Sequence, residues 1–235
     1  MFLLHGESKY IDCMERTLYN GVISGMSMDG GRFFYPNPLS SDGKYKFNAD
    51  GNTTRQPWFG CACCPSNLCR FIPSVPGYLY GVKDNNIYVN LFAGNTSTIK
   101  VNGKDVVLEE TTEYPWNGDI KIAVKKSGVK NANLLVRIPG WVRNQVVPSD
   151  LYKYSDAEKP AYTVTVNGKA VEADLDANKG YLPVKNIKKG DVIRIHFDMP
   201  VRTVVANGKV ADDKGKVAVE RGPLVYCAEA VDNQN

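Results

Sequence analysis

Residues 77–231 alternate apolar and polar side chains with a period of two, and this alternation constrains the fold more than any other feature of the sequence. The clearest apolar positions are Ile87, Val89, Leu91, Leu134, Val136, Ile138, Ile193, Ile195 and Phe197. A period of two is typical of strands that bury one face. Asn-Gly steps at 102–103, 167–168 and 207–208 predict type I′ hairpin turns, because both residue types tolerate positive φ. We therefore predict a mainly β fold, an antiparallel β-sandwich domain over residues 77–235.

The first 76 residues follow a different pattern. Apolar side chains recur every four residues between Tyr10 and Val22, which predicts one amphipathic helix over residues 3–26. From residue 27 to residue 57, Gly, Pro and polar residues interrupt any period, so we expect a long ordered loop that frames a site. A lone helix cannot bury its apolar stripe by itself. Residues 1–76 therefore look like the last part of a larger helical domain, or the helix docks on the sandwich.

Composition excludes several classes of protein. With 235 residues, 43% of them apolar, the chain can bury a core and is not disordered. No stretch approaches the roughly 18 uncharged apolar residues of a membrane span. The net charge of +4 comes from scattered lysines, so we expect no nucleic acid and no membrane as partner. Only two histidines are present, so acid, base or metal chemistry must depend mainly on carboxylates and cysteines.

Four of the six cysteines lie within nine residues, in the run WFGCACCPSNLCRF: Cys61, Cys63, Cys64 and Cys69. Such clustering indicates thiol chemistry or a metal rather than a disulfide scaffold. Adjacent thiols can both reach one zinc ion if the backbone turns sharply at Pro65. The run lacks the paired C-x₂-C elements of a zinc ribbon. A closed four-cysteine zinc site and a turn of small buried side chains both stay open as alternatives.

Six stretches, in this order, carry a resemblance to a known family: LLHGESKYIDCMERTLYNGVISGMSMDGGRFFYPNPL, RQPWFGCACCPSNLCRF, PGYLYG, NIYVNLF, LLVRIPGW and VERGPLVY. They resemble the C-terminal portion of glycoside hydrolase family 127, the β-L-arabinofuranosidase family, and CACCP is the most specific part. The resemblance implies an (α/α)₆ barrel, of which residues 1–76 would be a remnant, followed by β-sandwich modules. It also implies a zinc-dependent retaining glycosidase whose partner is a carbohydrate, an arabinose-containing plant glycan or glycoprotein.

By position, the resemblance makes Cys63 the nucleophile and a zinc ligand, and Cys64 a second zinc ligand. Zinc deprotonates a thiol, whose free pKa is about 8.5. Attack of the thiolate on the anomeric carbon, followed by hydrolysis, would give net retention. The resemblance places the acid/base glutamate and a Glu-x-Cys pair of zinc ligands before the matched residues, and this chain has no Glu-x-Cys. We therefore expect this chain to be catalytically incomplete, with an incomplete Zn²⁺ site.

Aromatic residues near the cysteine run are candidates for substrate binding, above all Tyr35 and Trp58. Together with Phe34 and Phe59 they can form a platform on which a sugar stacks, because a ring face and the C–H face of a sugar both prefer to leave water. The same rings can equally be core between the helix and the loop. Both interpretations stay open at this point.

The other candidate residues carry weaker signals. On the predicted helix, Cys13 reads as a core thiol, and Cys61 and Cys69 read as residues that support the cysteine pair. His196 falls on the polar side of a strand and reads as a solvated imidazole, and His5 lies at a helix start. Glu220 reads as a member of an ion pair at a strand edge.

A second hypothesis belongs to another class: a non-catalytic β-sandwich module that binds carbohydrate or docks a partner. A third is a structural zinc protein that uses the four clustered cysteines, whose folding would require the metal. Reduced thiols at a zinc site suit the cytoplasm, and also a periplasm if the metal protects them.

Overall fold

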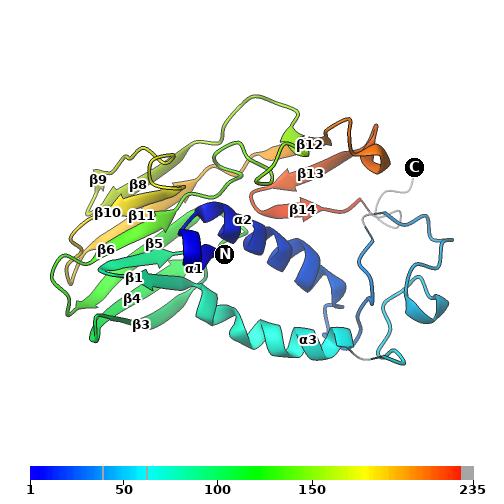
Figure 1. Cartoon of the computed structure of the whole chain (residues 1–235), viewed down its shortest axis with the longest axis horizontal. Coiled ribbons are helices and arrows are strands. Elements are labelled where there is room, and N and C mark those ends of the chain that lie inside the picture. Colours follow the sequence, from blue (N-terminus) through cyan, green and yellow to red (C-terminus); the bar gives the residue numbers. More distant parts are fainter. Residues whose placement is uncertain (39, 62, 229–235) are drawn as a thin grey trace. The chain divides into compact units, whose positions relative to one another are not determined.

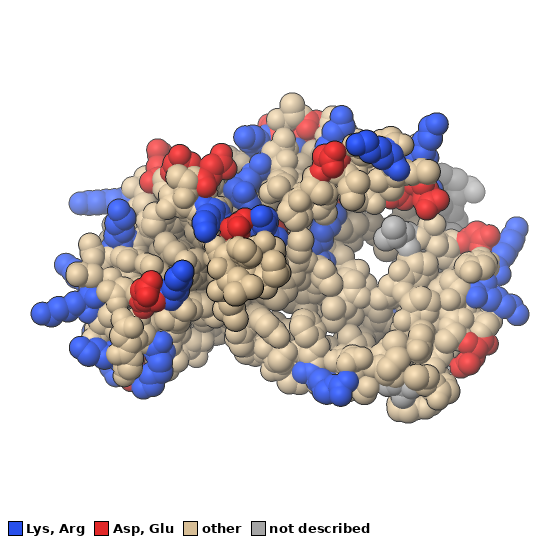
Figure 2. All heavy atoms as spheres, in the orientation of Figure 1, with Lys and Arg blue, Asp and Glu red and all other residues tan. Residues whose placement is uncertain are grey.

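The computed structural model describes residues 1–38, 40–61 and 63–228 (Figure 1). The chain divides into two compact units, one made of Met1–Cys13 with Tyr78–Asn235 and the other of Met14–Gly77. Among the described residues, no helix has the length and apolar character needed to cross a membrane. On the face in Figure 2, Lys and Arg side chains are interspersed with Asp and Glu rather than gathered in one patch.

Three sheets make up most of the first unit. The four-stranded sheet has the order β1 (Tyr80–Lys83), β2 (Asn86–Val89), β6 (Asn133–Arg137) and β10 (Tyr181–Val184). The six-stranded sheet has the order β3 (Asn95–Val101), β4 (Lys104–Thr112), β5 (Asp119–Ser127), β11 (Val192–Phe197), β8 (Tyr162–Val166) and β9 (Lys169–Ala170). The third sheet has the order β14 (Leu224–Tyr226), β13 (Val217–Arg221), β12 (Val201–Ala206) and β7 (Tyr152–Tyr154), and a 3₁₀ turn, Ala211–Asp213, precedes β13.

The prediction of a mainly β, mostly antiparallel fold is confirmed. Within the described part of the chain, every strand pair is antiparallel except β2 with β6, which run parallel and join Ile87 to Leu134 in register. The alternating apolar positions of β2, β6 and β11 are buried, with exposed fractions between 0% and 2%. In β2, β6 and β11 the buried positions alternate with more exposed ones, as the period of two requires.

Two of the three predicted Asn-Gly turns have the expected geometry. Asn102 and Gly103 both adopt positive φ between β3 and β4, and the step at 167–168 does the same between β8 and β9. The third prediction is wrong. Asn207 does not adopt positive φ; its backbone N–H donates to the carbonyl of Leu151 at 2.7 Å, and the chain then leads into a 3₁₀ turn instead of a tight hairpin.

The predicted single helix over residues 3–26 is interrupted. The first helix, α1 (Phe2–His5), ends at Gly6, whose φ of 64° and N–H bond to the Phe2 carbonyl form a left-handed cap. After it, α2 (Ser8–Thr17) continues as a π-helical turn, Leu18–Val22, and a 3₁₀ turn, Ile23–Gly25. In these last turns, side chains of Asn20 and Ser24 bond to carbonyls four residues earlier, a competition that distorts helices.

A buried ion pair fixes the beginning of α2 to the sheets of the first unit. Asp12 receives a bond from Arg137 at 2.7 Å and another from Arg143 at 2.9 Å. The Arg137 side chain is fully buried, and its Nε also donates to the carbonyl of Asn90 at 2.5 Å. Arg143 donates to Ser8 Oγ at 2.9 Å. Removing one partner of such a pair costs more than forming it gains, so Asp12 is a strong constraint on this helix.

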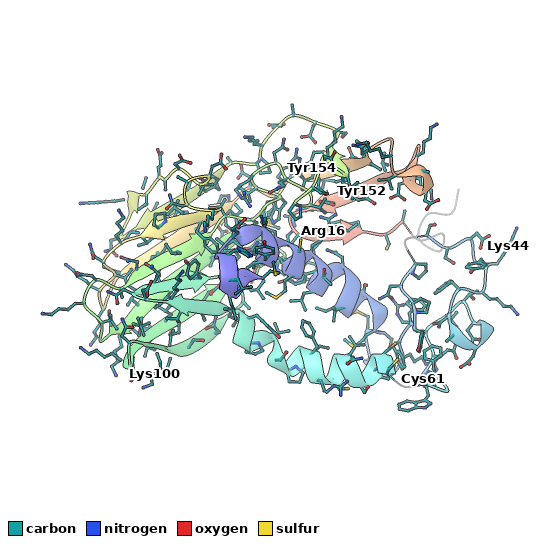
Figure 3. All side chains as sticks on the ribbon, in the orientation of Figure 1. Arg16, Lys44, Cys61, Lys100, Tyr152 and Tyr154 are labelled. Atoms are coloured by element: carbon teal, nitrogen blue, oxygen red, sulfur yellow. The ribbon has the colours of Figure 1, made fainter. Side chains whose placement is uncertain are left out.

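Two side chains in the first unit differ from their predicted or expected environments. Glu220 is 1% exposed and receives a hydrogen bond from Tyr154 at 3.3 Å, so its predicted place at a strand edge is wrong. The reason is that β13 lies between β12 and β14 rather than at the edge of its sheet. Tyr154, which Figure 3 labels, lies on β7. His5 ends α1 instead of starting a helix.

His196 is exposed, as predicted. Its ring nitrogens lie 2.7 Å from Asp119 and 3.1 Å from Asp198. The hydrogen bond to Asp119, followed by that to Asp198, raises the pKa of the imidazole.

The second unit contains the predicted loop and the cysteine run. The described residues between 27 and 57 form a 3₁₀ turn, Ala49–Gly51, and isolated bridges of Phe33 to Met26 and to Gln56. The unit continues with α3 (Cys63–Phe71) and the 3₁₀ segment Ile72–Tyr78. The predicted domain boundary between residues 76 and 77 stays a prediction. In the two compact units, by contrast, the first thirteen residues belong with the sheets.

Candidate active site

The cysteine run forms the start of a helix. Cys63 and Cys64 are the first two residues of α3, and Pro65 is the third. Proline is well tolerated in the first turn of a helix, because its missing N–H would have no partner there. The expectation of a sharp turn at Pro65 is therefore wrong. Figure 3 shows Cys61 beside the beginning of α3.

The adjacent thiols point toward the same space. None of the six cysteines, all of them among the described residues, forms a disulfide, and the Sγ atoms of Cys63 and Cys64 lie 3.9 Å apart. Two corners of a tetrahedral zinc site with bonds of about 2.3 Å are about 3.8 Å apart. The spacing of the two sulfurs therefore fits two ligands of one zinc ion, with two corners left for other ligands.

Tyr35 of the irregular loop contacts this pair. Its hydroxyl lies 3.3 Å from Cys63 Sγ, and its carbonyl lies 3.8 Å from Cys64 Sγ. The hydrogen bond from Tyr35, and then that from Cys64, lowers the pKa of the Cys63 thiol. Burial, and then the hydrogen bond to Cys63, raises the pKa of Cys64. A helix N-terminus also favours a thiolate.

The irregular loop holds Tyr35 in place. Its backbone N–H donates to Asn48 Oδ1 at 2.8 Å, and Asn48, which is 4% exposed, also donates to the Thr54 carbonyl at 2.9 Å. The Tyr35 ring packs edge-on against Phe59, at 5.5 Å between centroids, and Phe59 in turn packs against Phe33 at 5.0 Å. Phe59 is therefore core of this unit, which resolves one of the open alternatives for the aromatic residues.

The remaining predicted residues have different environments. Trp58 is 64% exposed, so its ring is available to a ligand rather than used in packing. Cys61 is exposed and lies close enough to Cys63 and Tyr35 to add to the shifts in their pKa values, after the larger effect of the contact between Cys63 and Tyr35. Cys69 lies six residues after Cys63 on α3, about 9 Å farther along the helix, which is too far to share one ion.

Among the described residues, no group of three or more His, Cys, Asp or Glu side chains gathers as a metal site. The alternative of a closed four-cysteine site therefore finds no support in the described residues.

Cys13 is exposed, so the prediction of a core thiol is wrong. The buried residues of this helical segment include Ile11, Glu15 and Leu18, and Cys13 lies on the opposite side of the helix from Ile11.

Sequence reasoning proposed Tyr35 as a sugar-stacking ring and missed its hydroxyl as the partner of Cys63. The two residues are 28 positions apart across a segment without period, so spacing could not connect them. Asn48 was missed for the same reason. The sequence offered one signal for this contact: among the aromatic residues of the loop, Tyr35 carries a hydroxyl that can bond to a thiol.

Comparison with known proteins agrees with these observations. Residues 1–77 match the family model described as the β-L-arabinofuranosidase GH127 catalytic domain, residues 86–199 the GH127 middle domain, and residues 201–235 the glycoside hydrolase family 127 C-terminal domain. A non-reducing end β-L-arabinofuranosidase of Bifidobacterium longum is 36% identical over 243 residues, covering 99% of this chain and 34% of that protein.

Two solved structures are similar over the same region. A GH127 β-arabinofuranosidase is 58% identical with a TM-score of 0.91, and the match covers 99% of this chain and 35% of that one. A GH127 β-L-arabinofuranosidase from Geobacillus stearothermophilus T6 is 38% identical with a TM-score of 0.83, over 99% and 35% of the two chains. The chain thus spans about a third of the length of these relatives. It belongs to glycoside hydrolase family 127.

Proposed function

We propose that this chain supplies the nucleophile of a zinc-dependent, retaining β-L-arabinofuranosidase. In this proposal Cys63 is the nucleophile and a zinc ligand, and Cys64 is a second zinc ligand. The observation that carries the proposal is the placement of two free sulfurs 3.9 Å apart at the start of α3, with the Tyr35 hydroxyl 3.3 Å from Cys63. Similarity to β-L-arabinofuranosidases supports the sugar class.

The residues of this chain contribute to both halves of a double displacement. When bound, zinc would hold the sulfur of Cys63 as a thiolate at neutral pH. The Tyr35 hydroxyl donates to that sulfur and favours the charged form. The Cys63 thiolate attacks the anomeric carbon, an S–C bond forms, and the bond to the leaving oxygen breaks. Water then attacks the same carbon, breaks the S–C bond and returns the thiolate, so the configuration is retained.

The reaction needs further groups, and we propose that they come from the part of the family's sequence that precedes the region matched by this chain. The leaving oxygen must take a proton from a general acid, which later removes a proton from the attacking water. The family resemblance assigns this role to a glutamate before the matched region. It places the other two zinc ligands and the rest of the (α/α)₆ barrel there as well. We therefore expect little hydrolysis of an aryl β-L-arabinofuranoside by this chain alone, with or without zinc. Robust turnover would contradict this expectation.

Metal binding by the sulfur pair can be tested without measuring activity. Titration of the reduced chain with Co²⁺, a spectroscopic substitute for Zn²⁺, is expected to give thiolate-to-cobalt charge-transfer absorption that Zn²⁺ then removes. Replacing Cys63 or Cys64 with Ser should weaken this absorption strongly, whereas Cys69→Ser, the matched control on the same helix, should not. Absorption that survives in the Cys63→Ser/Cys64→Ser double variant, or that requires Cys69, would overturn the assignment of the ligands.

A further inference from the structure

The loop between β4 and β5, residues 113–118, presents an indole ring to solvent. The Trp116 side chain is 68% exposed, whereas Trp141 in the same unit is 7% exposed. A buried tryptophan is explained by packing, but a ring left this open contributes little to the core. Exposed aromatic side chains on loops that a rigid scaffold positions are typical of binding surfaces.

The backbone under this ring is held on both sides. The Trp116 N–H donates to the Glu113 carbonyl at 2.9 Å, and the Trp116 carbonyl accepts from Arg221 Nη1 at 2.9 Å. Tyr114, two residues earlier, is buried and packs edge-on against Phe92 at 5.4 Å. Because the loop is already ordered, a ligand that binds the ring does not have to order the loop first.

The turn that carries Trp116 also carries polar side chains, and Arg221 of β13 bonds to its backbone. Asn117 Nδ2 donates to Glu113 Oε2 at 2.8 Å, and Asn117 Oδ1 accepts from the Asp119 N–H at 3.0 Å. The Glu113 carboxylate can only accept hydrogen bonds, the Asn117 amide can donate and accept them, and the Arg221 guanidinium can only donate them. The opposite charges of Glu113 and Arg221 favour neither an anion nor a cation. A neutral ligand with an apolar face and many hydroxyl groups matches this set.

We propose that Trp116, with Glu113, Asn117 and Arg221, forms a carbohydrate-binding surface of the sandwich unit. The indole stacks on the C–H face of a neutral sugar, and the polar groups of the turn bond to its hydroxyls. No bond in the sugar is broken at this surface, and neither a thiol nor a metal takes part. Only the choice of an L-arabinofuranose polymer as probe rests on the proposed function.

Affinity electrophoresis of the full 235-residue chain tests the proposal, with linear arabinan in one native gel and dextran in another. We expect arabinan, but not dextran, to retard the wild type. Trp116→Ala should bind at least about tenfold more weakly, and Trp116→Phe should be intermediate. Tyr226→Ala is the matched control, since Tyr226 is also an exposed aromatic of this unit, at 49%, and this variant should migrate like the wild type. Circular dichroism should show the same β content in all variants.

Several results would overturn the proposal. They are a wild type that neither arabinan nor dextran retards, a Trp116→Ala variant retarded as strongly as the wild type, or equal loss in Tyr226→Ala. A dimer in solution that Trp116→Ala dissociates, without any change in retardation, would show that the ring contacts a second copy instead. Cys63→Ser separates this proposal from the proposed function, because it removes the thiol chemistry and should leave the retardation unchanged.

Discussion

Glu110 provides a test of how burial controls the charge of a carboxyl group in the first unit. It lies on β4 and is 2% exposed; its carboxyl contacts the Tyr80 hydroxyl at 3.0 Å and the Ala93 N–H at 3.1 Å. Burial raises the pKa of Glu110 from 4.5 to about 8, although these hydrogen bonds act in the opposite direction. The folded protein therefore keeps Glu110 protonated at neutral pH.

The sign and size of the effect follow from proton linkage. Between pH 4.5, where the carboxyl ionises in the unfolded chain, and about pH 8, the folded state holds the extra proton. Stability therefore falls as the pH rises through this window. Within this window, each increase of one pH unit lowers the free energy of unfolding by about 1.36 kcal/mol. The free energy of unfolding should thus fall by about 3 kcal/mol on reaching pH 7 and by about 5 kcal/mol above pH 8.

Glu110→Gln removes the ionisation and keeps the shape. The amide oxygen can accept from the Ala93 N–H, and the amide nitrogen can donate to the Tyr80 hydroxyl. Urea unfolding followed by far-UV circular dichroism at pH 5, 7 and 9 gives the free energy of unfolding for each protein. We expect the stability of the variant relative to the wild type to increase by about 4 kcal/mol between pH 5 and pH 9.

The neighbouring Glu109 is the control. It lies on the same strand, is 40% exposed, and pairs with Lys125 at 3.0 Å. Glu109→Gln should change stability by less than about 1 kcal/mol at every pH. If the difference between Glu110→Gln and the wild type stays constant or shrinks from pH 5 to pH 9, Glu110 is charged in the folded state and the reasoning from burial is refuted.

Two further predictions concern the ion pair and the thiol. Asp12→Asn should lower the free energy of unfolding by about 3 kcal/mol in urea titrations, because it leaves the buried Arg137 without its carboxylate; a loss below 1 kcal/mol would mean that Asp12 contributes little. In metal-free protein, Tyr35→Phe should raise the pKa of the Cys63 thiol, because it removes the hydrogen bond that lowers it. Mass spectrometry should then show slower alkylation of Cys63 by iodoacetamide at pH 7, and unchanged or faster alkylation would contradict this.

Predictions based on a local period were confirmed where neighbouring residues alone decide the geometry. The Asn102-Gly103 turn depends on two φ angles, and the buried face of β11 depends on alternation within one strand. The prediction at Asn207 failed because its backbone bonds to Leu151, far away in the sequence. The predicted helix over residues 3–26 failed at Gly6, where a single residue with positive φ ends α1 before the apolar period begins at Tyr10.

The candidate site shows the same division. That Cys63 and Cys64 can both reach one ion could be expected from their adjacency, provided that the backbone turned sharply at Pro65. Their position at the start of a helix could not, because Pro65 suits a tight turn and the first turn of a helix equally well. The contact of Tyr35 with Cys63 depends on how Asn48 and Phe59 fold the irregular loop, and no local rule specifies that path.

The two adjacent thiols differ in a way that bears on their proposed roles. They share one helix end, so the helix dipole acts on both and cannot distinguish them. The difference comes from their neighbours: the Tyr35 hydroxyl lowers the pKa of Cys63, whereas burial raises the pKa of Cys64. Cys63 is also the more exposed of the two, as a group that must reach a sugar carbon has to be. This asymmetry favours Cys63 as nucleophile and Cys64 as the residue that only holds the metal.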